Sequence, residues 1–154
     1  MFATRYHWAL ITGPKVEKAI SRGQLYHAKN GATEGSWVIE SRATSLLQTN
    51  ALLTRLLVGK IADRDRVKEI LCGVPATSNN PEWNCVIWIK EALEALQQDS
   101  KAMGTSVLDW QAVRDAAMGY VQKKRDQGRW KGESALNLEY APTYDLLEKK
   151  ETIE

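Results

Sequence analysis

The sequence has few of the residues that hold small proteins together by covalent or metal bonds. It contains two cysteines, Cys72 and Cys85, and two histidines among 154 residues. Two cysteines are too few for a disulfide scaffold, and the second Cys/His pair that a structural zinc site requires is missing. We therefore expect no metal and no organic cofactor. Free thiols persist in reducing compartments, so the expected location is cytoplasmic.

Long apolar runs and an excess of one charge are also absent. No run approaches the roughly 20 apolar residues of a membrane-spanning helix, and residues 1–13 lack the pattern of a signal peptide. The net charge is only +2, although residues 55–68 and 122–131 each carry five Lys or Arg residues. Such basic runs are most often solvated helix faces. We therefore expect no membrane span and no nucleic-acid partner.

Proline and glycine are scarce, with 4 and 10 residues, which excludes collagen-like and disordered chains. Apolar residues make up 44% and charged residues 26% of the chain, as in ordinary globular domains. A chain of this length buries roughly two thirds of its unfolded surface. The composition therefore predicts one domain that folds around a single hydrophobic core.

The first part of the chain has the pattern of an antiparallel sheet. Aromatic and β-branched residues, interrupted by Gly-Pro and Asn-Gly turns, predict strands over residues 4–12, 24–28, 36–41 and 52–61. The fourth run is apolar enough to be a buried strand, with Gly59 as a possible bulge.

From Asp63 onward the apolar residues recur at helical spacing. They predict a short helix that ends at Gly73, an amphipathic helix over 85–98, and a helix over 109–124 with Gly128 past its end. Strands followed by helices indicate an α+β fold, with an antiparallel sheet of about four strands and the helices packed on one face.

We expect residues 1–128 to form a single α+β domain. Residues 129–154 lose helical periodicity but keep several leucines and tyrosines. This segment is predicted to be a C-terminal arm that docks in part on the domain or on a second copy, which makes a homodimer possible. The final seven residues are expected to fray.

The residues that could take part in catalysis are the two histidines and one of the cysteines. His7 and His27 lie in predicted strands, and Cys85 lies in the first turn of the clearest helix, after Asn84, a residue favoured at the N-cap. Unpaired N–H groups and the helix dipole stabilise a thiolate at such a position, and the same N–H groups can face an oxyanion. A strand histidine would then serve as the base.

These residues resemble a known group of enzymes. His7-Trp8-Ala9-Leu10 on one strand, His27 after Tyr26 on the next, and Asn84-Cys85 at a helix start are similar to circularly permuted papain-like hydrolases. That group includes the lecithin:retinol acyltransferase family, the PPPDE isopeptidases and, more distantly, the NlpC-type cell-wall peptidases. The chain also resembles small proteins of filamentous fungi that share the first strand and the Trp-Asn-Cys-Val-Ile-Trp segment.

The resemblance implies a role for each residue. Cys85 would be the nucleophile, His7 the general base, and His27 the residue that orients or polarises the base. The match covers about a fifth of the chain, and residues 86–89 read Val-Ile-Trp-Ile where the acyltransferases carry an acidic residue, a histidine or aromatic residue, and phenylalanine. The resemblance therefore implies an architecture more than a substrate.

Aromatic and polar residues near this set are further candidates. Those that could contact a substrate are Tyr6, Trp8, Trp83 and Trp88. Aromatic residues around a helix start are also often core residues, so both interpretations stay open for Trp83 and Trp88. The possible polar neighbours of His27 are Gln24, Ser36 and Glu40. Cys72 is interpreted as a packing residue.

The sequence therefore predicts a cysteine-dependent acyl-transfer enzyme, a hydrolase or an acyltransferase. Its substrate would be an amide, thioester or ester of a small molecule or peptide, attacked through an acyl-enzyme on Cys85 with His7 as base. The alternative is a non-catalytic binding or scaffold protein that keeps the papain-like fold. In that case His7 and His27 are half-buried strand histidines and Cys85 is a small apolar helix residue.

Overall fold

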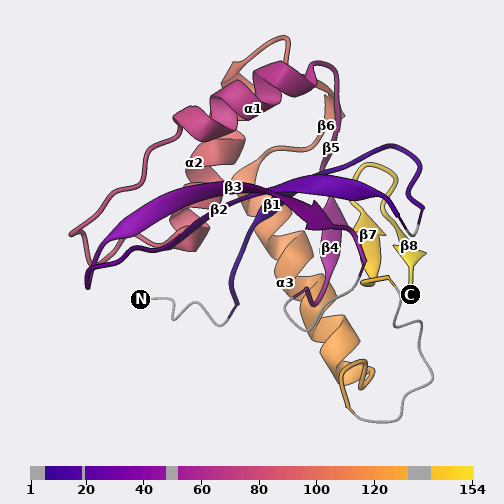
Figure 1. Cartoon of the computed structure of the whole chain (residues 1–154). Coiled ribbons are helices and arrows are strands. Elements are labelled where there is room, and N and C mark those ends of the chain that lie inside the picture. Colours follow the sequence, from indigo (N-terminus) through magenta and orange to yellow (C-terminus); the bar gives the residue numbers. More distant parts are fainter. Residues whose placement is uncertain (1–5, 19, 48–51, 132–139) are drawn as a thin grey trace.

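The structure is a computed structural model that describes residues 6–18, 20–47, 52–131 and 140–154. Within them the chain forms three helices and three small sheets, which confirms the α+β class. Figure 1 shows two long strands crossing the middle of the molecule, with α1 (Arg64–Gly73) above them and α3 (Trp110–Asp126) below them in this view. The first two residues of the first predicted strand, and residues 132–139 of the predicted arm, lie outside the described residues.

The central sheet consists of β1 (Leu10–Thr12), β2 (Arg22–Asn30) and β3 (Trp37–Ser45), all antiparallel and in the order β1-β2-β3. A hydrogen bond from the Gly31 N–H to the Ser36 carbonyl, 2.8 Å long, closes the hairpin between β2 and β3. That closure fixes the register, in which Asn30 pairs with Trp37 and His27 pairs with Glu40. Three of the predicted strands are therefore present, and two of them are longer than expected. The first is reduced to its last three residues, so His7 precedes the strand in which it was predicted to lie.

The two faces of this sheet have different environments. Tyr26 and Ala28 on β2 are buried in the main core, which also contains residues of α2. Because successive strand side chains point to opposite faces, His27 lies on the other face, which we call the outer face. The register gives the outer face its remaining members on β2 and β3, among them Lys29, Glu40 and Arg42.

The fourth predicted strand is divided between two other sheets. Arg55–Leu57 forms β4, which pairs in parallel with β7 (Thr143–Asp145). Gly59–Ile61 forms β5, which pairs antiparallel with β6 (Met103–Ser106). The expectation of one sheet of about four strands is therefore wrong in its fourth strand. The physical cause is tertiary, since the two halves of the segment pair with strands that lie far apart in the chain. The register of β5 and β6 shifts between Gly59 and Ile61, where Gly59 predicted a possible bulge.

The three helices begin and end close to their predicted limits. They are α1 (Arg64–Gly73), α2 (Cys85–Gln98) and α3 (Trp110–Asp126). Each starts at a polar N-cap whose side chain accepts backbone N–H groups, and for α2 this residue is Asn84. Gly128 follows α3 with φ of 72°, the left-handed conformation that glycine adopts most readily after a helix.

The C-terminal segment is part of the fold. Thr143–Asp145 forms β7, which lies between β4 and β8 (Lys150–Ile153) in the second sheet. The frayed end that the sequence led us to expect is instead strand β8, paired antiparallel with β7. Lys124 of α3 forms an ion pair with Glu151, which fastens β8 to the helix.

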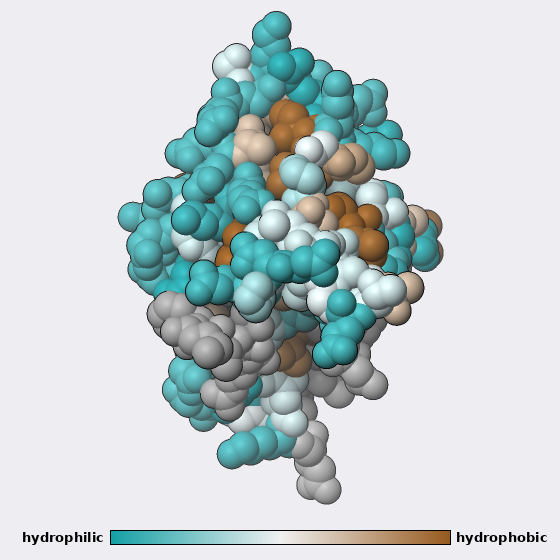
Figure 2. Space-filling view, turned by 90° about the vertical axis from the view of Figure 1, so that its left-hand side faces the viewer, coloured by the Kyte–Doolittle hydropathy of each residue, from teal (hydrophilic) through white to brown (hydrophobic). Residues whose placement is uncertain are grey.

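The main core lies between the inner face of the central sheet and α2. Its centre is Trp88, whose side chain is fully buried and whose indole N–H donates to the Val74 carbonyl at 3.1 Å. The surface seen from the left-hand side of Figure 1 is mostly hydrophilic with separate hydrophobic patches (Figure 2). In the described part of the chain, no helix is both long and apolar enough to cross a membrane.

Candidate functional site

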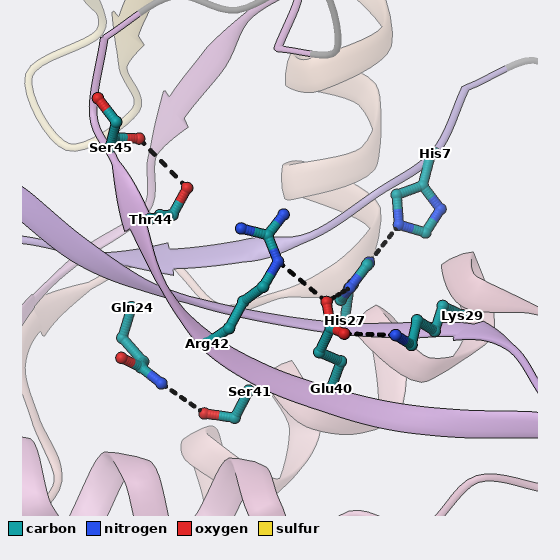
Figure 3. Close-up of polar contacts among 9 residues, drawn as sticks. All are labelled: His7, Gln24, His27, Lys29, Glu40, Ser41, Arg42, Thr44 and Ser45. Atoms are coloured by element: carbon teal, nitrogen blue, oxygen red, sulfur yellow. Dashed lines mark hydrogen bonds and ion pairs between the residues drawn. The ribbon is translucent and has the colours of Figure 1, made fainter.

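Three side chains on the outer face form a continuous hydrogen-bonded series. His7 Nε2 lies 2.6 Å from His27 Nδ1, and His27 Nε2 lies 3.0 Å from Glu40 Oε1. Strand pairing explains the second contact, because His27 and Glu40 are direct cross-strand partners. His7 precedes β1, and its ring meets that of His27 edge to face, with centroids 4.9 Å apart. Figure 3 shows the series extending from β3 across β2 to the segment before β1.

Two cations share the carboxylate at the end of the series. Lys29 Nζ forms an ion pair with Glu40 Oε2, and Arg42 Nε lies 3.0 Å from Glu40 Oε1. The hydrogen bond from Lys29 is the largest cause, and that from His27 the next, of a pKa of Glu40 lowered to about 2. Glu40 is therefore a carboxylate at any pH near neutrality, and it acts only as a hydrogen-bond acceptor.

The charge of Glu40 also determines where the protons lie when both rings are neutral. A carboxylate must accept, so His27 carries its proton on Nε2 and donates it to Glu40. His27 Nδ1 is then an acceptor, and His7 donates to it from Nε2. The remaining lone pair lies on His7 Nδ1. The series therefore presents a basic nitrogen on an exposed ring.

His7 is also tuned towards its neutral form. Partial burial of the ring is the main cause, and the nearby charge of His27 the second, of a pKa lowered below 6.5. At pH 7 the ring is therefore ready to accept a proton. This is the property required of a general base.

Cys85 lies elsewhere in the fold. It is 5% exposed and belongs to the same core as Tyr26 and Ala28, the neighbours of His27 that point to the inner face. Among the described residues, no hydrogen bond joins Cys85 Sγ to His7 or His27. The structure therefore brings the two histidines together with Glu40 and sets Cys85 on the opposite side of β2.

The start of α2 also differs from the expected open oxyanion site. Asn84 Oδ1 accepts the N–H groups of Val86 and Ile87, at 2.9 and 3.1 Å. These groups belong to the first turn, where free N–H groups were expected to face a thiolate or an oxyanion. The N-cap was correctly predicted, but the cap itself occupies donors that the chemistry would use.

The other thiol is the accessible one. Cys72 is exposed on α1, whereas Cys85 is buried. The interpretation of Cys72 as a packing residue is therefore wrong. Although it follows two apolar residues in sequence, its position in the last turn of α1 turns its side chain towards solvent, while Leu71 takes the buried face.

The aromatic candidates do not gather around the histidines. Trp83 and Trp88 are buried in the core, so of the two interpretations left open for them, core residue or groove wall, the first is correct. Trp8 packs on Trp110 at the start of α3, with ring centroids 5.6 Å apart. The Tyr6 ring lies 5.3 Å below the Arg125 guanidinium. Tyr6 and Trp8 pack the N-terminal segment against α3, and His7 lies between these two residues in the sequence.

Of the three polar neighbours proposed for His27, Glu40 is the one that contacts it. Gln24 instead donates to Ser41 at 2.8 Å, and the Ser36 hydroxyl donates to the Thr33 carbonyl at 2.6 Å within the hairpin loop. In Figure 3, Gln24 and Ser41 lie on the opposite side of the strands from Glu40.

Two members of the cluster, Lys29 and Arg42, were not among the predicted site residues. Each lies two positions from a histidine or glutamate of the series, and strand periodicity places residues i and i+2 on one face. The Asn30-Gly31 turn signal, combined with this alternation, was the sequence signal that could have found them.

The fold and the outer-face cluster define an α+β protein with a carboxylate–imidazole–imidazole series on its central sheet. Among the described residues, no group of three or more His, Cys, Asp or Glu side chains is arranged to hold a metal ion. Residues 2–153 match the family of unknown function DUF6914, and the chain therefore belongs to that family. No curated protein and no solved structure matches the chain.

Proposed function

We propose that this protein is a hydrolase or acyltransferase whose general base is His7, held and polarised by His27 and Glu40. The observation that supports the proposal is the series Glu40, His27 and His7, joined at 3.0 and 2.6 Å. Such a series orients the terminal ring and stabilises the imidazolium that forms when the ring takes a proton. The substrate class is an amide, thioester or ester.

The reaction would begin at His7 Nδ1. This nitrogen takes the proton of the nucleophile as the nucleophile forms a bond to the acyl carbon, and the carbonyl π electrons move onto oxygen. Collapse of the tetrahedral intermediate breaks the bond to the leaving group, which receives the proton from His7. Meanwhile the His7 Nε2–H continues to donate to His27, and Glu40 compensates the added positive charge.

Two nucleophiles are compatible with this base. The first is Cys85 Sγ, which the resemblance to permuted papain-like enzymes implies and which would form an acyl-enzyme. The second is a water molecule at the exposed His7 ring. The structure favours water, because Cys85 is buried on the inner side of β2 and would have to move to reach His7. The routes differ in whether Cys85 forms a covalent acyl adduct.

The experiment compares His7→Gln and Cys85→Ala with the parent protein on a thiol-directed acyl probe and on a panel of activated esters, thioesters and amides. Loss of turnover in both variants, with probe labelling of the parent at Cys85, supports the covalent route. Loss only in His7→Gln, by about 100-fold or more, supports the water route. Full turnover in His7→Gln on any substrate found for the parent overturns the proposal.

The second candidate function is a binding or scaffold protein. It is favoured by the burial of Cys85 and by the capped start of α2, which together give this cysteine the surroundings of a packing residue. A binding protein would retain its partner in both His7→Gln and Cys85→Ala. Substitution of the basic end of α3, at Lys123 and Arg125, would weaken that binding instead.

A further inference from the structure

Arg42 uses only part of its hydrogen-bonding capacity. Its Nε donates to Glu40 Oε1 at 3.0 Å, and among the described residues neither Nη1 nor Nη2 has a hydrogen-bond partner. The side chain is 53% exposed. A guanidinium that is fixed through Nε and free at both Nη atoms presents a fork of donors in a defined direction.

The fork lies on the same side of the strands as the proposed base, at the other end of the hydrogen-bonded series. Arg42 and Glu40 occupy the same face of β3, and Figure 3 shows the Arg42 guanidinium on the same side of the strands as the His7 ring. In that view the two Nη atoms point away from Glu40. A small molecule that binds on this side of the strands therefore meets donors that no described protein group occupies.

The charge balance of the cluster favours an anion. Lys29 and Arg42 supply two positive charges and Glu40 supplies one negative charge, so one positive charge remains when both histidines are neutral. Lys29 and His27 already satisfy Glu40 through Oε2 and Oε1. Arg42 is therefore not needed to neutralise the carboxylate, and its remaining charge is available to a ligand.

We propose that Arg42 binds an oxyanionic group of the ligand, a carboxylate or a phosphate, through its two Nη atoms on the same face of the sheet as His7. This inference rests on the proposed function, in which the substrate is an acyl compound. It adds that the substrate carries a negative charge on the side that faces Arg42. Arg42 is then a specificity-determining residue of the site.

The test is a binding measurement that does not depend on turnover. The full chain, labelled with ¹⁵N and ¹³C, is titrated in separate experiments with acetate and with inorganic phosphate while the His7 and His27 ring signals are followed by NMR. We expect a saturable shift with at least one anion, at a fixed pH of 7. We also expect the bound anion to raise the pKa of His7, because a nearby negative charge favours the imidazolium.

The variants separate a specific site from general attraction to cations. Arg42→Gln should lower the affinity for the anion at least tenfold. Arg42→Lys should lower it at least threefold, because lysine keeps the charge and loses the fork of donors. Arg66 is the matched control, since its Nε donates to Asp99 at 2.7 Å in the same manner on α1. Arg66→Gln should leave anion affinity within twofold of the parent.

The outcomes also separate this inference from the proposed function. No saturable shift with either anion, or equal affinity in Arg42→Gln and the parent, overturns the anion site whatever the enzyme does. Anion binding that depends on Arg42, together with full turnover in His7→Gln, supports the anion site and overturns the base. The preferred anion identifies whether the ligand carries a carboxylate or a phosphate.

Discussion

At the scale of single residues, His7 owes its properties to its neighbours on the outer face. Burial of the ring, and then the charge of His27, lower the pKa of His7 below 6.5. The unfolded chain therefore binds more protons than the folded chain as the pH falls through 6.5. This group accordingly makes the folded state less stable at acidic pH and has no such effect at neutral pH.

The first prediction is the titration of His7. The midpoint of its ring signal in NMR should lie below 6.5, because partial burial of the ring is the main cause, and the charge of His27 the second, of its lowered pKa. The signal of unfolded protein in denaturant provides the reference. A midpoint at or above that of the unfolded chain would contradict the tuning of His7 towards a neutral base.

The second prediction concerns the two thiols. In the folded protein Cys72 should react with iodoacetamide faster than Cys85, because Cys72 is exposed and Cys85 is 5% exposed. Peptide mapping by mass spectrometry after short labelling times measures both rates in one sample, and labelling in denaturant should make them similar. Faster labelling of Cys85 in folded protein would instead show an activated, accessible thiol and would favour the covalent route.

At the scale of elements, Gly59 allows β5 and β6 to approach closely. A Cβ atom at this position would lie 2.7 Å from Met103 Cε and 2.8 Å from Ser106 Cβ. The end of the methionine side chain can move, but Ser106 Cβ is attached to the backbone of β6. The absence of a side chain at Gly59 thus permits the close, irregular pairing of β5 with β6.

The third prediction compares two glycine substitutions. Gly59→Ala should lower the free energy of unfolding by about 1–3 kcal/mol because of this overlap. Gly73→Ala is the control, since no atom lies within 4 Å of a Cβ at that position in the last turn of α1. It should be neutral or stabilise the protein by up to about 1 kcal/mol. Denaturant unfolding followed by circular dichroism measures both, and equal effects would refute this account of Gly59.

At the scale of the whole molecule, the C-terminal strand is joined to α3 by a buried polar network. Glu151 accepts a hydrogen bond from the Tyr120 hydroxyl at 2.6 Å and forms an ion pair with Lys124, which is almost completely buried. Burial, and then the hydrogen bond to Glu151, raise the pKa of Tyr120 well above 10. The network therefore holds a lysine charge inside the protein, compensated by one carboxylate.

The fourth prediction is the effect of neutralising that carboxylate. Glu151→Gln should lower the free energy of unfolding by about 2–3 kcal/mol, because it leaves the buried Lys124 ammonium without its counter-charge. Glu148→Gln is the control, since Glu148 pairs with Lys150 on the surface, where the side chains are 60% and 61% exposed. It should change stability by no more than about 0.5 kcal/mol. Similar effects of the two substitutions would exclude a structural role for the network.

Local features of the sequence determined the helices and the α+β class. Helix caps and apolar spacing act over a few residues, so Asp63, Asn84 and Asp109 mark the starts of α1, α2 and α3 without help from the rest of the chain. The β2–β3 hairpin is similarly local. Its turn and its strand alternation suffice to predict the pairing of His27 with Glu40, although Glu40 was one of three candidate neighbours of His27.

Only the tertiary structure decided the partners of β4 and β5, the pairing of the C-terminal strands, and the side of β2 on which Cys85 lies. Each depends on contacts between residues far apart in the chain, such as Arg55 with Thr143, which no local pattern specifies. Alternation along β2 separates His27 from Tyr26 and Ala28 but does not say which face α2 covers. Packing of α2 on Tyr26 and Ala28 made that choice, because burying these apolar faces together with Trp88 and Cys85 removes the most hydrophobic surface from water.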